Sequence, residues 1–428
     1  MGVAARNGGP RVCAVRARRD RVVVIGSGVI GLCAAYFLGR LGRPVVVLER
    51  DGEGGNNCSR ENAGMVVPSH FTPLAAPGVV RQGLKWLLDG ESPFFVRPRL
   101  SWELTRWGWL FLRHANAKHV GRCVEVLRDL HLESRILFAE MAGREEFGLQ
   151  QRGLLMLCES ERFLEEEARL AERARELGLQ VEVCDPARLA ELDPDLEMKV
   201  KGGIWYEQDC HLDPARFLHV LREAILKDGG EIRYHSAVKE VGERNVLLES
   251  GEEVKGETIV VAGGAWTPAL AKSLRLRLPM QAGKGYSMTL REAAKIPRLC
   301  SLLAEAKVAV TPIGPSLRIA GTMEICGNDL TVNERRVQGI IKAACRVFPE
   351  LSPADFEGVK RWAGLRPCSP DGMPYIGRVR GREDVIVATG HAMLGLSLGP
   401  VTGKLVAGMV SGEKAPDWLE KLAPQRFS

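Results

Sequence analysis

The sequence predicts an α/β fold joined to an α+β portion built on an antiparallel or mixed sheet. Three segments support this prediction. Residues 21–49 have the pattern of a buried strand, a glycine-rich turn, a helix and a second buried strand. Residues 257–266 have the pattern of another buried strand that ends in small residues. Residues 304–325 alternate between strand and turn signals, as antiparallel strands do. A chain of 428 residues has room for two or three such domains.

The composition is that of an ordinary globular protein, with 45% hydrophobic and 26% charged residues. Most of the net charge of +6 lies at the amino terminus, because residues 1–21 contain six arginines and one acid, Asp20. These residues supply +5 and leave +1 for the rest of the chain. A nucleic-acid partner is therefore disfavoured. We predict a basic, disordered extension over residues 1–20.

The eleven cysteines show no CxxC pair and no Cys/His spacing typical of a metal site. We expect reduced thiols, a cytoplasmic location and no metal. No uninterrupted apolar run is long enough for a membrane-spanning helix.

A GxGxxG pattern joins the first predicted strand to the first helix through Gly26, Gly28 and Gly31. The first glycine permits the tight turn, the second lets a pyrophosphate approach the backbone, and the third lets helix and strand pack closely. The turn also contains Val29 and Ile30, and the predicted helix follows it over residues 32–41. The free N–H groups and dipole at the start of this helix favour phosphate. This unit predicts dinucleotide binding.

Glu49 ends the second strand and can accept hydrogen bonds from both ribose hydroxyls. This acid disfavours a 2′-phosphate, although Arg50 follows it. NAD and FAD both fit the motif. The glycine-rich loop 54–65 favours FAD, because it is suited to wrap the pyrophosphate and ribityl chain of an extended cofactor; the alternative is a plain surface loop.

Two further strand ends are expected at the cofactor. The strand that begins near residue 231 leads to Val238, whose backbone is placed to contact an adenine. Ala262 and Gly263 end the buried strand within 257–266, where the carboxyl edge of a sheet approaches a cofactor.

Residues 81–119 contain four of the eight tryptophans, with seven Lys or Arg and three acids. Leu104, Trp107 and Phe111 share one face of the predicted helix. Two interpretations stay open: an aromatic-rich core helix with solvated arginines, or a peripheral contact with a membrane surface through residues 84–113.

Taken in order, the motifs resemble the FAD-dependent D-amino-acid dehydrogenases, within the wider group of D-amino-acid, glycine and sarcosine oxidases. The resemblance covers roughly residues 21–412. It is carried by Gly26–Gly31 with Glu49, Ser59 with Asn62–Gly64, Gly285–Ser287, Arg318–Glu324, Gly364–Pro367 with Pro370–Gly372, and Gly390–His391 with Leu394–Gly395.

The resemblance implies a discontinuous, Rossmann-like FAD-binding domain and a second, substrate domain. We expect the former over residues 21–100, 186–275 and 360–418, and the latter over 101–185 and 276–359. No His or Cys is clearly placed for flavin attachment, which favours non-covalent FAD. The predicted cofactor-binding residues are Gly26, Gly28, Val29, Ile30, Gly31, Glu49, Arg50, Ser59, Asn62, Ala63, Gly64, Val238, Ala262, Gly263, Gly390, His391, Leu394 and Gly395.

The implied reaction is oxidation of a D-amino acid by hydride transfer from Cα to flavin N5, followed by hydrolysis to a 2-oxo acid and ammonia. An arginine is the expected clamp for the substrate carboxylate. Arg318 and Arg366 are the candidates, with Tyr286 as a hydroxyl partner and His391 as a flavin or substrate contact. Members of the family that the chain resembles often have an arginine at the position of Pro312.

The identity of the substrate and of the electron acceptor stays open. The stretch Gly395–Pro400 is more similar to the glycine and sarcosine oxidase branch. One alternative is therefore an amine oxidase that acts on glycine, sarcosine or D-proline with oxygen. Another is a non-catalytic flavoprotein subunit. In the favoured interpretation the electrons pass to a quinone or another acceptor. We expect the enzyme to be cytoplasmic, or peripheral on the inner face of the cell membrane.

Overall fold

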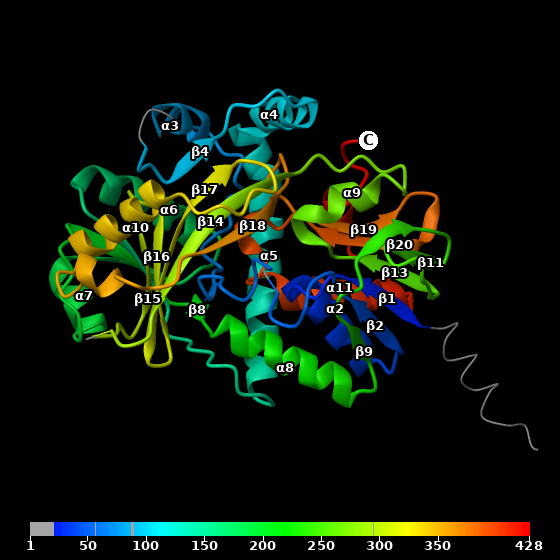
Figure 1. The fold of residues 1–428 in the computed structure, drawn as a ribbon. Coiled ribbons are helices and arrows are strands. Elements are labelled where there is room, and N and C mark those ends of the chain that lie inside the picture. Colours follow the sequence, from blue (N-terminus) through cyan, green and yellow to red (C-terminus); the bar gives the residue numbers. More distant parts are fainter. Residues whose placement is uncertain (1–20, 56, 87–89, 294) are drawn as a thin grey trace, which may run out of the picture.

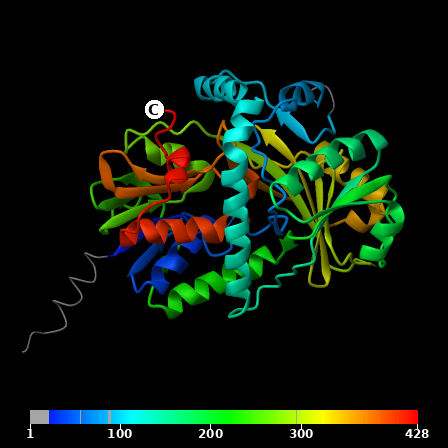
Figure 2. The same ribbon diagram turned by 180° about the vertical axis from the view of Figure 1, so that it is seen from behind.

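The computed structural model describes residues 21–428 except 56, 87–89 and 294 (Figure 1). The extension predicted over residues 1–20 lies outside the described residues. The described strands form a six-stranded sheet and a nine-stranded sheet, with two smaller sheets beside them. The long helix α5 (Ala117–Ala142) runs between the two large sheets and is seen along its whole length from behind (Figure 2). In the described part of the chain, no helix is both long and apolar enough to cross a membrane.

The six-stranded sheet has the order β19-β20-β13-β1-β2-β9. Strand β1 lies at its centre and pairs in parallel with β2 and β13. All four residues of β1, of β2 and of β13 are buried, as expected for parallel strands that are covered on both faces. The strands are β1 (Val22–Ile25), β2 (Val45–Leu48), β9 (Glu231–Arg233), β13 (Thr258–Val261), β19 (Tyr375–Val379) and β20 (Arg382–Thr389).

The two faces of this sheet are covered by different layers. Val22 and Val24 of β1 pack with residues of three helices, α2 (Val29–Arg40), α8 (Pro214–Lys227) and α11 (Gly399–Ser411). Val23 packs on the opposite face, toward a small three-stranded sheet. The strands of that sheet are β10 (Val238–Val241), β11 (Asn245–Leu248) and β12 (Glu253–Lys255), and α9 (Thr267–Ala271) packs with them. The predicted Rossmann-like layer is confirmed.

The nine-stranded sheet is mixed, as predicted, because its antiparallel pairs are interrupted by the parallel pairs β15–β5 and β17–β4. Helices α6 (Glu161–Glu176), α7 (Pro186–Leu192) and α10 (Glu334–Val347) pack against it. The strands are β4 (Phe94–Val96), β5 (Leu154–Cys158), β6 (Val181–Cys184), β7 (Gly202–Tyr206), β14 (Gln281–Leu290), β15 (Cys300–Leu303), β16 (Val308–Ile313), β17 (Ser316–Ile325) and β18 (Trp362–Cys368).

Strand pairing corrects the predicted domain boundaries. Strands β4, β7 and β18 fall within the ranges predicted for the FAD-binding domain, yet all three hydrogen-bond into the nine-stranded sheet. The reason is physical: a short apolar run identifies a strand, whereas its partner is set by pairing with residues far along the chain. A further pair, β3 (Met65–Val66) with β8 (Cys210–His211), lies apart from both large sheets.

The aromatic-rich segment forms α3 (Val79–Trp86), β4 and α4 (Trp102–His114). Ser101 caps α4 by accepting a hydrogen bond from the Leu104 N–H. One face of α4 packs on β17 and β18 through Trp107, which contacts a cluster containing Met323 and Cys368. The interpretation as a core helix is therefore correct for this face. The opposite face is exposed, and it is considered below.

A buried ionic cluster lies between the nine-stranded sheet and α10. The Glu324 carboxylate lies 3.7 Å from the Lys284 ammonium and 3.1 Å from the Arg336 guanidinium. It also accepts a hydrogen bond of 2.8 Å from the Tyr286 hydroxyl. All three charged side chains are nearly inaccessible to solvent. Asp329, also within 4 Å of Lys284, is more exposed.

We expect Glu324→Ala to lower the free energy of unfolding by about 3–5 kcal/mol, because it leaves two buried cations without their shared carboxylate. Urea denaturation measures this change. The matched control is Arg162→Ala, which breaks an exposed pair with Glu166 and should cost less than about 0.5 kcal/mol. Equal losses in the two variants would show that the buried cluster contributes no more than a surface pair.

Candidate functional site

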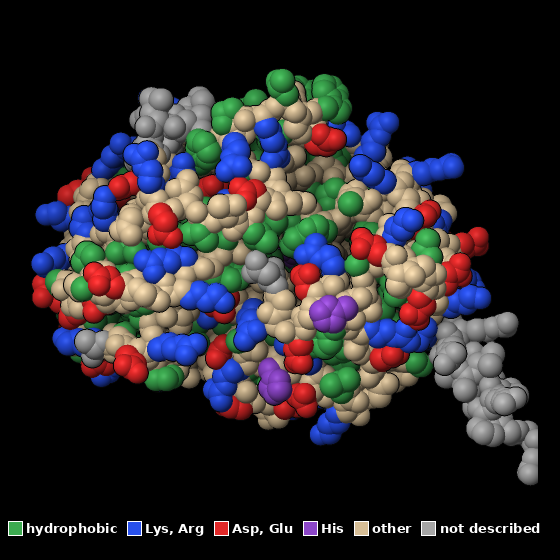
Figure 3. All heavy atoms as spheres, in the orientation of Figure 1, with side chains coloured by type: hydrophobic (Ala, Val, Ile, Leu, Met, Phe, Trp, Pro, Cys, Tyr) green, Lys and Arg blue, Asp and Glu red, His purple; other side chains and the backbone are tan. Residues whose placement is uncertain are grey.

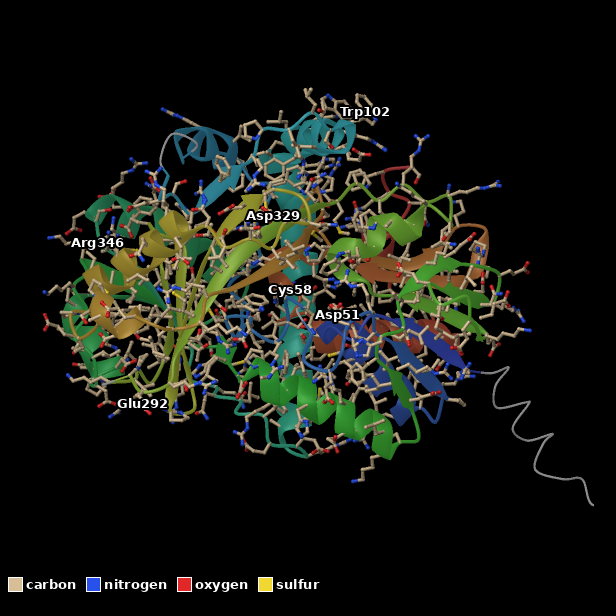
Figure 4. The ribbon with its side chains drawn as sticks, viewed as in Figure 1. Asp51, Cys58, Trp102, Glu292, Asp329 and Arg346 are labelled. Carbon is tan, nitrogen blue, oxygen red and sulfur yellow. The ribbon has the colours of Figure 1, made fainter. Side chains whose placement is uncertain are left out.

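A cavity opens at the carboxyl ends of β1, β2 and β13 and reaches strand β18 of the nine-stranded sheet. This edge is where ligands bind in doubly wound α/β sheets. Figure 4 shows Asp51 and Cys58, two residues of its lining, between the two large sheets. The predicted residues that line the cavity are Gly26, Gly28, Val29, Ile30, Glu49, Arg50, Ser59, Asn62, Val238, Ala262, Gly263, Arg366, His391 and Gly395.

The three glycines of the GxGxxG pattern are required for different reasons. Gly26 has φ +103°, and a Cβ there would lie 2.7 Å from the Ala262 carbonyl oxygen. A Cβ on Gly31 would lie 2.0 Å from the Gly26 carbonyl oxygen. Close backbone packing alone therefore explains why Gly26 and Gly31 have no side chain. Gly28 differs, because its φ of −69° suits any residue and its Cβ would meet only the Ser59 hydroxyl, at 3.4 Å. The space beside Gly28 belongs to the cavity rather than to a protein side chain.

Glu49 is held rigidly at the cavity. Its Oε2 accepts hydrogen bonds from the Ser27 N–H at 2.8 Å and the Ser27 hydroxyl at 2.7 Å. Its Oε1 accepts from the Asp51 N–H at 3.0 Å. The Arg50 guanidinium lies over the Trp266 ring, 4.0 Å from its centroid, and both residues line the cavity. Ser236, Val238 and Glu249 lie at this cavity as well.

Ser59 links the glycine-rich loop to the start of α2, because its hydroxyl accepts a hydrogen bond of 3.0 Å from the Val29 N–H. Five predicted cofactor residues do not line the cavity. Gly31, Gly64 and Gly390 are places of close backbone packing, since a Cβ on each would lie 2.0–2.6 Å from protein atoms. Ala63 and Leu394 pack in the core cluster around α5. These five support the fold around the site; they do not form its surface.

Arg366 lines the cavity from β18. Its Nη1 donates a hydrogen bond of 2.7 Å to the Thr322 carbonyl oxygen. Its guanidinium lies directly over Gly285, where a Cβ would come within 2.2 Å of Nη1. Among the described residues, no carboxylate lies within ion-pair distance of Arg366. Burial lowers the pKa of this arginine, and the opposing influence comes from the Cys368 and Cys58 thiols rather than from a carboxylate. The cavity therefore contains a cation that lacks an anionic partner.

Arg318 does not fit the role of carboxylate clamp. Its Nη1 donates to the Asn62 carbonyl oxygen at 2.8 Å, and its Nη2 lies 2.9 Å from the Glu61 carboxylate. Its Nε donates to the Thr289 hydroxyl at 3.0 Å. All three nitrogens are thus used within the protein, and Arg318 is not part of the cavity lining. It instead holds the loop that carries Ser59 and Asn62.

Tyr286 also lies outside the cavity. Its ring packs with α10 on the other face of the nine-stranded sheet. The hydroxyl donates to Glu324 and accepts from the Asn333 N–H at 3.2 Å, so both of its hydrogen-bonding functions are used. The alternation of strand residues explains the error, because neighbouring positions of β14 face opposite sides of the sheet. Its neighbour Ser287 has a buried hydroxyl without a hydrogen-bond partner.

His391 follows the end of β20 and lines the cavity. Its Nε2 lies 3.0 Å from the Thr402 hydroxyl, whereas its buried Nδ1 has no hydrogen-bond partner. Burial lowers its pKa to about 3, so the imidazole is neutral at physiological pH. A neutral imidazole can position a ligand by hydrogen bonding but supplies no positive charge.

The sequence interpretation missed part of the lining. Cys58, within the glycine-rich loop 54–65, lines the cavity near Arg366, and burial raises the pKa of its thiol. Its position next to Ser59 was the available signal. Trp266, Ser236 and Thr389 also line the cavity. They come from three segments far apart in the sequence, so that no local pattern brings them together.

The residues fit an extended dinucleotide such as FAD. A fixed carboxylate lies at one strand end, a glycine without a packing role borders the cavity, and the buried Nδ1 of His391 lacks a partner. Glu49 would hold the ribose, the backbone at Gly28 would face the pyrophosphate, and Val238 lies where the adenine is expected. Arg366 and His391 would lie toward the redox ring.

Comparisons with known proteins agree with this fit. The chain is 31% identical over 418 residues to a D-amino acid dehydrogenase from Vibrio atlanticus, covering 95% of this chain and 99% of the relative. A D-amino acid dehydrogenase from Paramagnetospirillum magneticum is 32% identical, with 95% and 99% covered. Among solved structures, glycine oxidase from Geobacillus kaustophilus superposes with a TM-score of 0.76 at 22% identity, covering 95% of this chain and 99% of that one.

L-proline dehydrogenase from P. horikoshii superposes with a TM-score of 0.72 at 18% identity, covering 96% and 98% of the two chains. At this level of identity the superpositions establish the fold alone. The family described as FAD dependent oxidoreductase (DAO) matches residues 21–409, nearly the whole described chain. On the combined evidence of the cavity and this match, the chain belongs to the DAO family of FAD-dependent oxidoreductases.

Proposed function

We propose that this protein oxidises D-amino acids to 2-oxo acids and ammonia, with FAD bound non-covalently in the cavity. The observation that carries the proposal is the unpaired guanidinium of Arg366 in the lining. A buried cation without an acid partner favours an anionic ligand, and the planar guanidinium matches a carboxylate. The curated relatives named D-amino acid dehydrogenases support the choice of substrate.

The protein's part in this chemistry is to bind and orient. FAD, when bound, accepts a hydride from the substrate Cα. Arg366 would fix the carboxylate, and thereby the direction of the Cα–H bond. The amine loses one proton as the hydride leaves, which gives an imino acid. Water then adds to the carbon–nitrogen double bond and ammonia leaves. His391, being neutral, would act through a hydrogen bond.

We further propose that the two electrons pass to a quinone, which takes up two protons and becomes a quinol. The relatives are named dehydrogenases, and this name favours an acceptor other than oxygen. An oxidase would instead reduce oxygen to hydrogen peroxide. Peroxide production during turnover, measured with and without an artificial quinone, separates the two. We expect turnover that depends on the quinone; stoichiometric peroxide in its absence would identify an oxidase.

Anaerobic titration of the purified holoenzyme tests the substrate. D-, L- and N-methyl amino acids are added one at a time while the visible flavin absorbance is recorded. We expect D-alanine or another D-amino acid to bleach the flavin and its L-enantiomer to leave the spectrum unchanged. Bleaching by sarcosine or glycine alone would favour the amine oxidase, and a flavin that no amino acid reduces would favour a non-catalytic subunit.

A further inference from the structure

Helix α4 has an exposed apolar face in addition to its buried one. The described residues include ten large hydrophobic side chains that are exposed, and four of them lie within residues 100–112. They are Leu100, Trp102, Trp109 and Leu112, with exposures of 109%, 76%, 54% and 57%. We call these four residues the α4 patch. Figure 3 shows hydrophobic side chains gathered over α4, and Figure 4 shows Trp102 pointing outward there.

The spacing makes the patch continuous. Positions 102, 109 and 112 recur at helical intervals, so these three side chains lie on one stripe of α4, and Leu100 immediately precedes the helix. The opposite stripe, which includes Trp107 and Leu110, is buried. Solvated helices seldom present two tryptophans and two leucines together, and an apolar surface of this kind marks an interaction site.

The charges around the patch indicate which partner it fits. Residues 97–118 contain five Lys or Arg and one acid, Glu103. Three of the cations are used within the protein. Arg97 pairs with Asp329 at 3.1 Å, Arg99 donates to Gln281, and Arg106 donates to the Phe427 carbonyl oxygen at 3.1 Å. The Arg113 guanidinium lies over the Trp109 ring, 4.7 Å from its centroid. In the described part of the chain, no carboxylate lies within ion-pair distance of Arg113 or Lys118, and both are exposed.

We propose that the α4 patch docks onto the surface of a bilayer that contains anionic phospholipid. Tryptophan rings and leucines would enter the headgroup and upper acyl region, and Arg113 and Lys118 would contact lipid phosphates. The helix has 13 residues and carries charges, so it would lie in the plane of the interface.

The patch is one side-chain layer away from the candidate site. Trp107, on the buried face of α4, donates a hydrogen bond of 2.9 Å to the Cys368 carbonyl oxygen and packs with Ala392. Ala392 lines the cavity, as do Arg366 and Pro367, which directly precede Cys368 on β18. Docking would therefore bring the redox end of the cavity close to the lipid, where a quinone is dissolved. The delivery of electrons to a quinone in the bilayer rests on the proposed function. Binding of the α4 patch to lipid does not, and it is measured independently of turnover.

Co-sedimentation with vesicles tests the docking. The FAD-loaded full chain is mixed with vesicles of phosphatidylcholine alone or of phosphatidylcholine with phosphatidylglycerol. We expect binding to the anionic vesicles that falls at high salt. The double substitution Trp102→Ser/Trp109→Ser should weaken partitioning about tenfold or more, because both rings lose their lipid contacts. Arg113→Glu should weaken it on anionic vesicles only.

Ile136→Ser is the matched control, because Ile136 is 55% exposed on α5 and lies outside the patch. It should bind vesicles as the wild type does. Flavin content and thermal melting verify that each variant is folded, and flavin bleaching by a D-amino acid in solution should remain in all of them. Loss of vesicle binding with intact bleaching would support docking, whereas absence of bleaching in the wild type would contradict only the proposed function.

Three outcomes would overturn the inference. The wild type could remain in the supernatant with both kinds of vesicle. The tryptophan variant could bind as tightly as the wild type. Light scattering could instead show a dimer that becomes monomeric in the tryptophan variant, together with no vesicle binding, in which case the patch is an interface between two copies of the chain.

Discussion

Gly28→Val should yield a folded protein that has lost FAD, with an affinity at least about 100-fold lower than that of the wild type. The backbone at Gly28 has an ordinary φ of −69°, and a Cβ there meets only the Ser59 hydroxyl, at 3.4 Å. The valine methyl groups would occupy the space expected for the pyrophosphate. Flavin content after purification, and fluorescence titration of the apoprotein with FAD, measure the effect.

Two matched glycines make this prediction specific. Gly31→Val should prevent folding, because its Cβ would lie 2.0 Å from the Gly26 carbonyl oxygen. Gly121→Val, on the exposed face of α5, should keep both fold and FAD, because its Cβ would meet no atom within 4 Å outside the local backbone of its own helix. A yellow, fully loaded Gly28→Val variant would refute the placement of the cofactor.

Arg366→Met should raise the substrate dissociation constant by about 100-fold or more while leaving the FAD content unchanged. Removing one partner of a buried, hydrogen-bonded charge pair typically costs 2–5 kcal/mol. Anaerobic flavin bleaching as a function of D-amino acid concentration gives the dissociation constant directly. The side chain has no acid partner to leave behind in the described residues, so the folded state should tolerate its loss.

Arg318→Met provides the contrast between the two candidate arginines. Because Arg318 is hydrogen-bonded to the loop that carries Ser59 and Asn62, its loss should weaken FAD binding and change substrate affinity less than about tenfold. If Arg318→Met instead impaired substrate affinity and Arg366→Met did not, the assignment of the carboxylate site would be reversed.

The sequence predicted the nucleotide-binding half well because its signals are local. The strand, glycine turn, helix and acid from Val22 to Glu49 lie within one segment, and each residue type has one physical reason to be there. The mixed sheet of the other half was also expected from its alternating strands. The pairing of these strands could not be predicted, because β7 and β18 join the same sheet although more than 150 residues of chain separate them.

The candidate site shows the same division. Gly28, Glu49 and Ser59 could be identified from motif positions, whereas the roles of the arginines depended on which atoms surround each guanidinium. Arg318 and Arg366 look equivalent in the sequence, since both lie among apolar residues of predicted strands. Only the fold distinguishes the two. Arg318 is bonded to the Glu61 carboxylate and the Asn62 carbonyl oxygen, whereas Arg366 faces the cavity. The face of the nine-stranded sheet on which Tyr286 lies was likewise not predictable, because it depends on the pairing register of β14.

The flavin content of the purified wild-type chain tests the central claim most directly. We expect a yellow protein with one FAD per chain, released into solution when the protein is denatured. A colourless polypeptide that takes up no FAD on reconstitution would contradict the placement of the cofactor between the glycine turn of β1 and the end of β13.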